Sequence, residues 1–181
     1  STEESQTLLR SALEEFPVTY AEEWQRMFRS KLGLQLEHDD DIELIERLLQ
    51  AMHDSKVDFT TFFRQLSNIQ KDSKPSHIAQ RDEFLDRESI DQWFADYLHR
   101  LQAEVFSDKA RKEMMDQINP KYILRNYLAQ VAIEKAQQDD FSEIERLQLI
   151  LSKPFDEQEP FEAYAKPPPV DMQRIEVSCS S

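Results

Sequence analysis

Only one glycine, Gly33, occurs in this chain of 181 residues, whereas an average protein has about 7% glycine. Loops that cradle phosphate groups need glycine where a backbone N–H must approach the ligand closely or adopt a positive φ. Tight hairpins between β-strands also favour glycine, and the sequence contains neither Asn-Gly nor Asp-Gly. The glycine content therefore excludes a glycine-rich phosphate loop within these residues and predicts an all-α fold.

Hydrophobic periodicity supports the same fold class. Apolar residues recur at helical spacing in eight stretches, which predicts a compact domain of seven or eight helices over residues 1–153. The stretches run from Leu8 to Phe16, Tyr20 to Leu32, Ile42 to Met52, Phe59 to Ile69, Ile90 to Val105, Ala110 to Ile118, Ile123 to Ala132 and Phe141 to Leu151. The polar stretch 71–80 is the best candidate for an internal seam.

Local signals predict where the first helices begin and end. Pro17 is expected to stop the first helix, because proline lacks the N–H that a helix interior requires. Thr19 with Glu22 forms a capping box that would open the second helix, and Gly33 is suited to a left-handed cap at its end. Asp58 is a plausible N-cap for the helix that carries the Phe59 stretch.

Similar signals occur in the second half of the chain. Ser89 with Gln92 predicts the start of a helix over 89–105. Asn119 followed by Pro120 fits an N-cap and the first position of the next helix. Several prolines after residue 153 predict that 154–181 is an irregular, extended tail, which ends near Cys179.

The net charge, the apolar runs and the cysteine count exclude several classes of partner and location. The net charge of −14 opposes binding to nucleic acid and to anionic membrane surfaces. The chain has no apolar run near the roughly 18 residues of a spanning helix, and no signal-like start. Cys179 is the only cysteine, so a disulfide within these residues is excluded. We expect a soluble protein of a reducing compartment such as the cytoplasm, without nucleic-acid or membrane partners.

Metal-binding and catalytic patterns are not found in the sequence. A calcium-loop interpretation of the segment starting at Asp54 fails, because Lys56, Phe59 and Gln65 occupy positions that require a ligand, a glycine and a glutamate. The four histidines are scattered, and no Glu-x-x-His pair occurs. The 36 acidic residues give little specificity to any carboxylate pair. We therefore assign no catalytic, cofactor or metal residue here.

One segment departs from the acidic pattern. Residues 100–135 contain seven basic and five acidic side chains. Lys121 and Arg125 are predicted to share one face of a helix, since they are four residues apart. This face is either an ordinary solvated surface or a surface that docks on an acidic or phosphate-bearing partner.

Three ordered segments resemble the C-terminal part of the selenoprotein O family. The most recognisable is 119–130 (NPKYILRNYLAQ), the second is 57–64 (VDFTTFFR), and the third is the terminus 175–181 (IEVSCSS). The family-motif and interface candidates are Asn119, Pro120, Lys121, Tyr122, Arg125 and Asn126.

The resemblance implies more than the residues themselves show. The family has a kinase-like (pseudokinase) fold and is understood to transfer AMP from ATP to protein hydroxyls, with Mg or Mn as cofactor. Its catalytic and metal-binding residues lie upstream of the resembling part, so the chain would be inactive alone. Its partners would be the upstream core and, for the full-length enzyme, protein substrates. Vertebrate members carry selenocysteine where this chain has Cys179, which makes Cys179 a redox candidate.

Two other classes of function remain as alternatives. The first is a free-standing helical interaction module that binds a partner helix or peptide in a groove. The second, a small metal-dependent helical enzyme, ranks last because the ligand spacing is missing. A supporting C-terminal helical domain of an adenylyltransferase is the interpretation we carry forward.

Overall fold

A computed structural model describes residues 2–169 and residue 172. Its helices, with short 3₁₀ turns designated η, are α1 (Thr2–Leu32), α2 (Asp41–Ser55), α3 (Phe59–Leu66), η1 (Pro75–His77), η2 (Ala79–Glu83), α4 (Arg87–Leu101), α5 (Asp108–Ile118), α6 (Asn126–Ala136), α7 (Ser142–Leu151), η3 (Glu159–Phe161) and α8 (Glu162–Ala165). Within those residues there are eight α-helices and no strand. The predicted all-α fold is confirmed.

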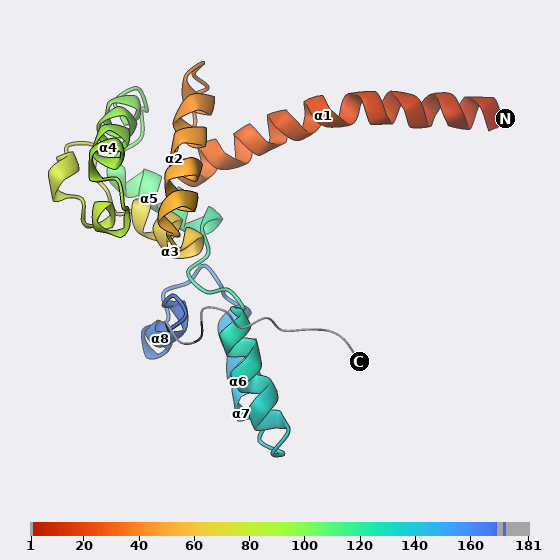
Figure 1. Cartoon of the computed structure of the whole chain (residues 1–181), viewed down its shortest axis with the longest axis vertical. Helices are drawn as coiled ribbons and strands as arrows, with labels where there is room; N and C mark the ends of the chain where they lie inside the picture. Colours follow the sequence, from red (N-terminus) through yellow and green to blue (C-terminus); the bar gives the residue numbers. More distant parts are fainter. Residues whose placement is uncertain (1, 170–171, 173–181) are drawn as a thin grey trace.

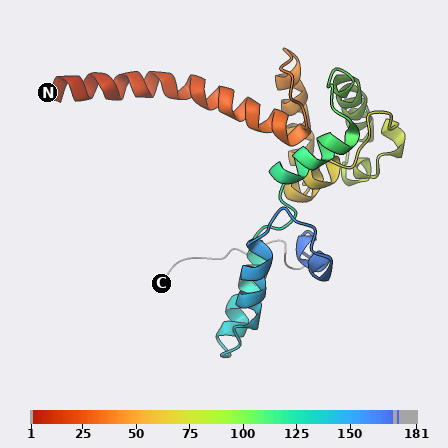
Figure 2. The ribbon, with the colours of Figure 1, turned by 180° about the vertical axis from the view of Figure 1, so that it is seen from behind.

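The helices form a body with two projections (Figure 1). Helices α2 to α5 and the last turns of α1 surround the main hydrophobic core. The first half of α1 leaves this body as a long arm, and α6 and α7 project from it as a pair (Figures 1 and 2). A second, smaller cluster joins Leu128, Ala132 and Leu147 between α6 and α7. Among the described helices, none is long and apolar enough to cross a membrane.

Trp93 lies at the centre of the main core, as the apolar stripe of α4 predicted. Its indole Nε1 donates a hydrogen bond to the Leu44 carbonyl of α2 at 2.8 Å. Its ring stacks on Tyr97 with centroids 5.1 Å apart, and the Tyr97 hydroxyl donates to the Leu32 carbonyl at 2.7 Å. These two hydrogen bonds satisfy the polar atoms of both aromatic residues inside an apolar environment. Trp93 therefore fixes α4 against α2, and Tyr97 fixes it against the end of α1.

The start of α1 contradicts the predicted break at Pro17. The helix runs without interruption from Thr2 to Leu32, so the capping box at Thr19 is also wrong. Proline removes one hydrogen bond from a helix interior. Pro17 and Thr19 are both exposed in the arm, where water can satisfy the carbonyl that loses its partner. The helix therefore continues through Pro17, although proline usually ends a helix.

The end of α1 follows the prediction for Gly33. Its φ of +71° lies in the left-handed region. The N–H of Leu34 donates to the Arg29 carbonyl at 2.9 Å, and that of Gly33 donates to Ser30 at 3.1 Å. This pair of bonds is the Schellman arrangement that closes a helix. A Cβ at this position would lie 2.7 Å from Sδ of Met115, so close packing on α5 also requires glycine.

Three predicted helix starts or faces need correction. Asp58 caps α3 as predicted, but Phe59 is exposed rather than buried. Helix α4 begins at Arg87. Its N-cap is Asp86, three residues before Ser89, which was the predicted N-cap. It ends at Leu101, and Val105 beyond it is exposed. The Asp86 carboxylate accepts the N–H of Ser89 at 3.0 Å, so an aspartate supplies the cap that was predicted from a serine.

Helix α5 buries a different face from the predicted one. The expected stripe was Ala110, Met114 and Ile118, but Ala110 and Met114 are only half-buried and Ile118 is exposed. The buried residues are Arg111 and Met115, one position further along. Burial of the Arg111 side chain is partly compensated by hydrogen bonds to the Tyr97 hydroxyl and the Ile69 carbonyl, while its Nε has no hydrogen-bond partner. Because hydrophobicity alone places arginine on the surface, the periodicity predicted the wrong face.

Two predictions about the C-terminal part are also wrong. Asn119 and Pro120 do not open a helix, because α6 begins at Asn126. The region after Pro154 is not uniformly extended, because η3 contains Pro160 and α8 follows it directly. Proline is compatible with the first turn of a helix, where its missing N–H has no partner. Cys179 lies outside the described residues.

Candidate functional site

The segment with the strongest family resemblance forms the link between the body and the C-terminal helices. We refer to residues 119–125 as the connector, since they join the end of α5 to the start of α6. Two of its residues, Asn119 and Tyr122, are buried. The connector is therefore held inside the fold over part of its length, although it has no regular secondary structure.

Asn119 closes α5 and attaches it to α1. Its backbone N–H donates to the Met115 carbonyl at 2.8 Å. Its side-chain Nδ2 donates to the Lys31 carbonyl at 3.0 Å, and Nζ of Lys31 donates to its Oδ1 at 3.3 Å. An asparagine side chain can accept and donate at once, so one residue satisfies the ends of two helices.

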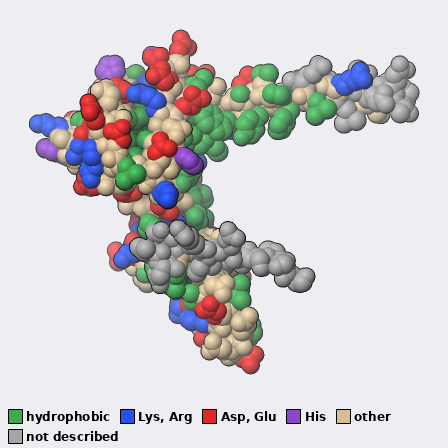
Figure 3. Space-filling view, in the orientation of Figure 1, with side chains coloured by type: hydrophobic (Ala, Val, Ile, Leu, Met, Phe, Trp, Pro, Cys, Tyr) green, Lys and Arg blue, Asp and Glu red, His purple; other side chains and the backbone are tan. Residues whose placement is uncertain are grey.

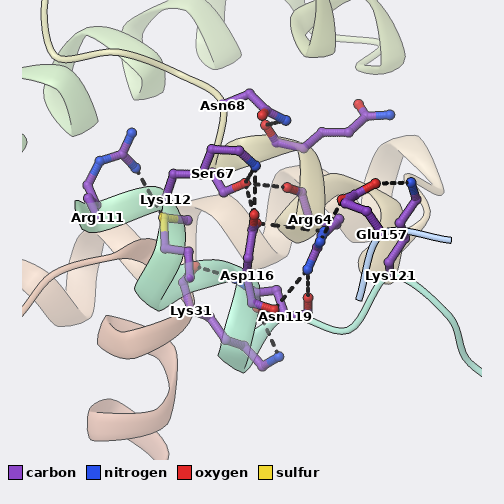
Figure 4. A network of polar contacts seen from close by, with 12 residues as sticks. Lys31, Arg64, Ser67, Asn68, Arg111, Lys112, Asp116, Asn119, Lys121 and Glu157 are labelled. Carbon is purple, nitrogen blue, oxygen red and sulfur yellow. Dashed lines mark hydrogen bonds and ion pairs between the residues drawn. The ribbon is translucent and has the colours of Figure 1, made fainter. Parts of the chain in front are cut away.

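Arg64 of α3 is the centre of the polar network (Figure 4). Its Nη1 donates to the carbonyls of Asp116 and Asn119 at 2.8 and 3.1 Å. Its Nη2 donates to Oε1 of Glu157 at 2.7 Å. Carbonyls at the end of a helix lack intrahelical partners, and a nearby arginine can supply them. Arg64 therefore joins α3, the end of α5 and the segment after α7 in one contact.

Asp116 extends the network along α5. Its Oδ1 accepts a hydrogen bond from the Ser67 hydroxyl at 2.7 Å, and its Oδ2 accepts from Lys112 at 2.7 Å. The Arg64 guanidinium lies 3.7 Å from the same carboxylate. The three donors come from α3, its C-cap and α5, so they connect α3 to α5 through one acidic side chain (Figure 4).

Lys121 and Tyr122 attach the segment after α7. Their backbone N–H groups both donate to the Pro154 carbonyl, at 2.8 and 3.0 Å. The Lys121 ammonium pairs with Glu157 and Glu162, and the Tyr122 hydroxyl donates to the Gln158 carbonyl at 3.1 Å. Hydrogen bonds from Lys121 and Arg64 hold the pKa of Glu157 below its usual value. This carboxylate is thus shared by two cations.

Arg125 binds the residue that caps α3. Its Nη1 and Nη2 donate to the two carboxylate oxygens of Asp58 at 2.6 and 2.9 Å. Asp58 also accepts the Thr61 N–H at 2.8 Å. Burial alone would raise the pKa of Asp58, but the hydrogen bonds from Arg125 and Thr61 outweigh it, and the pKa is lowered. Nη2 of Arg125 also donates to the Thr61 hydroxyl at 3.4 Å, whereas its Nε is buried without a hydrogen-bond partner.

These contacts bring together two segments that resemble the same family. Asp58 and Arg64 belong to the stretch 57–64, and both contact the stretch 119–130, through Arg125 and the Asn119 carbonyl. The two stretches are 55 or more residues apart in the sequence. The residue patterns that carry the resemblance therefore form one structural unit.

The predicted shared face of Lys121 and Arg125 is wrong. Both residues precede α6, and their charged groups point to different partners, Glu157 with Glu162 and Asp58. The side chains are 13% and 9% exposed. Their charges are therefore balanced mainly inside the molecule. Pro120 lies in the connector, and Asn126 is the first residue of α6.

Sequence reasoning missed the residues that organise the network. Arg64, Asp116 and Glu157 were not singled out, although Arg64 ends the family-like stretch 57–64. It also missed the buried Arg100, which pairs with Asp41 at 2.7 Å and Glu104 at 2.9 Å. A buried ion pair has no periodic signature, because each charged residue looks like a surface residue until its partner is known.

The network borders an open pocket of about 610 Å³ on the side of α3 and α8. Arg64, Lys112 and Lys121 line it together with Asp116, Glu157 and Glu162. Its lining thus mixes charges of both signs that already pair with each other. In residues 2–169 and 172, no three His, Cys, Asp or Glu side chains lie close enough together to hold a metal ion. The arrangement is suited to holding chain segments together.

Comparison with known proteins agrees with the resemblance. A family model described as "Protein adenylyltransferase SelO" matches residues 4–152. Proteins called "Protein nucleotidyltransferase YdiU" match over 172 residues, or 95% of the chain, with 46% identity in Burkholderia ambifaria, 47% in Cupriavidus metallidurans and 48% in Herminiimonas arsenicoxydans. The match covers 33%, 32% and 34% of these relatives.

The chain thus spans about a third of the length of the curated relatives it matches. The family model covers most of the chain, including nearly all of α1, helices α2 to α7 and the connector. Both stretches that meet at Arg64 and Arg125 fall inside the matched range. On these grounds the chain belongs to the SelO family of protein adenylyltransferases.

Proposed function

We propose that this chain is the C-terminal helical part of a protein adenylyltransferase. In this proposal the complete protein transfers AMP from ATP to hydroxyl side chains of protein substrates in the bacterial cytoplasm. The chain supports the kinase-like core, which the rest of the protein supplies. The observation that carries the proposal is the meeting of the family-like stretches 57–64 and 119–130 in one network, within a chain that the family model matches.

The described residues do not fit the nucleotide or the metal that such a reaction uses. The carboxylates of the network already pair with cations: Asp58 with Arg125, Asp116 with Lys112, and Glu157 with Lys121. Gly33, the only glycine, is used to end α1 against Met115. We therefore assign ATP and Mg or Mn to the rest of the protein and no chemical step to this chain.

The test uses the full-length protein and two forms of labelled ATP. With ATP labelled on the α-phosphate, protein substrates should become labelled in the presence of Mg or Mn. With ATP labelled on the γ-phosphate they should not, because AMP transfer releases pyrophosphate. Labelling from the γ-phosphate alone would indicate phosphoryl transfer and would refute the proposal.

The proposal also keeps the redox role of Cys179, which lies outside the described residues. It is supported by the family resemblance of the terminus 175–181. A disulfide of Cys179 in the full-length protein should change the rate of AMP transfer, and Cys179→Ser should abolish that change. Equal activity of oxidised and reduced protein, without a disulfide at Cys179 in peptide maps, would remove this part.

A further inference from the structure

The arm of α1 carries a stripe of large apolar side chains that is open to solvent. Leu13, Phe16, Tyr20 and Met27 are 71%, 65%, 60% and 42% exposed. With Trp24 they follow the spacing of three and four residues that places side chains on one helical face. We refer to these five residues as the α1 stripe. Figure 3 shows hydrophobic side chains gathered along this arm, whereas the body carries mixed charges.

The α1 stripe is continuous with the hydrophobic core. Phe16 and Tyr20 stack with centroids 6.0 Å apart. One turn later, Trp24 packs on the core residue Phe28 with a centroid distance of 4.7 Å. The stripe therefore extends the core surface outward along a helix that leaves the body (Figures 1 and 2).

Such an arm is unfavourable in water. Helical stability in proteins comes mostly from packing of an apolar face, and isolated helices are marginal even with good helix formers. The arm also contains Pro17 in its interior, and proline destabilises a helix interior because it lacks the backbone N–H. A contiguous exposed apolar surface is a common mark of a protein–protein contact. The α1 stripe thus has the character of a contact surface.

We propose that the α1 stripe docks on an apolar surface of the remaining two thirds of the same polypeptide, the kinase-like core. This inference rests on the proposed function. The matched relatives are about three times as long as the matched part, so the complete protein has about two thirds of its residues outside this chain. A second copy of this chain is the weaker occupant, because each copy carries a net charge of −14 and the two would repel.

Cysteine labelling measures directly whether the α1 stripe is shielded from solvent. Phe16→Cys places a thiol in the stripe, and Val18→Cys places one on the opposite side of the same helix. Val18 is the matched control because it is 60% exposed, close to the 65% of Phe16. Both variants are made with Cys179→Ser, in the full-length protein and in the 181-residue chain. A maleimide probe and peptide mapping give the rate at each position.

In the full-length protein, position 16 should react about tenfold or more slowly than position 18, because its thiol is accessible only when the contact opens. In the 181-residue chain the two rates should be similar. Leu13→Cys, which removes less volume than Phe16→Cys, should repeat the result.

Equal rates at positions 16 and 18 in the full-length protein would overturn the docking proposal, whatever its activity. Protection at position 16 in the 181-residue chain that grows with concentration would also overturn it, by identifying a second copy as the cover. If the full-length protein protects position 16 but transfers no AMP, the docking stands and the proposed function fails.

Discussion

The pair between Arg125 and Asp58 can be tested by a double-mutant cycle. Arg125→Met removes two charge-assisted hydrogen bonds, of 2.6 and 2.9 Å, while keeping much of the side-chain volume. Hydrogen bonds to charged groups contribute about 1.5 to 3 kcal/mol each. Asp58 regains water when the arginine is lost, since its side chain is 21% exposed. We therefore expect Arg125→Met to cost about 2 kcal/mol in total, which is below the roughly 3 kcal/mol that two such bonds would contribute if Asp58 did not regain water.

Asp58→Asn removes the charge of the partner but keeps an oxygen for the Thr61 N–H, because asparagine caps helices as well as aspartate does. The effect of this substitution therefore reports on the ion pair, because the N-cap hydrogen bond is kept. The free energy of unfolding of the double variant should be little lower than that of the less stable single variant. This corresponds to a coupling energy of about 1.5 kcal/mol between the two residues.

Urea unfolding of the four proteins at pH 7, followed by circular dichroism, measures the coupling. The contribution of Asp58 should also depend on pH, since its folded pKa is lowered. Its stabilisation is present above the unfolded value of about 3.9 and is lost as the pH falls through the folded pKa. The stability difference between the parent and Asp58→Asn should therefore shrink below about pH 4. Single losses that add up fully in the double variant would refute the pairing.

Three further substitutions probe the core, the α1 cap and the network. Trp93→Ala should cost about 3 to 5 kcal/mol in urea unfolding through lost burial and a cavity; an unchanged midpoint would contradict its central position. Gly33→Ala should lower the free energy of unfolding by about 2 kcal/mol, because a left-handed φ is unfavourable for alanine and its Cβ would lie 2.7 Å from Met115 Sδ. An unchanged midpoint of thermal unfolding would exclude both effects. Arg64→Met should cost about 3 kcal/mol and speed proteolysis after α7, whereas the exposed control Arg47→Met should cost under about 1 kcal/mol; equal losses would show that Arg64 is not the centre of the network.

The sequence contains enough information for the fold class and for most of the helices. The spacing of Ile90, Trp93 and Tyr97 predicted the buried face of α4, because large apolar residues leave few alternatives for a helix. Gly33 and Asp58 were predicted as caps for the same kind of reason, since only a few residue types serve these positions. These are local properties, and they hold in the structure.

The predictions are wrong where solvent or a residue distant in the sequence determines the local structure. Pro17 does not end α1, because water can reach the backbone of the exposed arm. Asn119 looks like an N-cap, yet its side chain is taken by Lys31 of α1, which is 88 residues away. Arg111 is buried because Tyr97 and Ile69 supply its partners. Local propensity contains no term for such contacts, so the connector and its network could not be derived from the sequence.

The central claim is that this chain supports nucleotide chemistry without binding the nucleotide itself. Calorimetric titration with Mg-ATP, performed in parallel on the 181-residue chain and on the full-length protein, tests it most directly. We predict a saturable binding signal for the full-length protein and none for the chain, because the carboxylates of its network are paired with cations. A dissociation constant in the low micromolar range for the chain alone would contradict the claim.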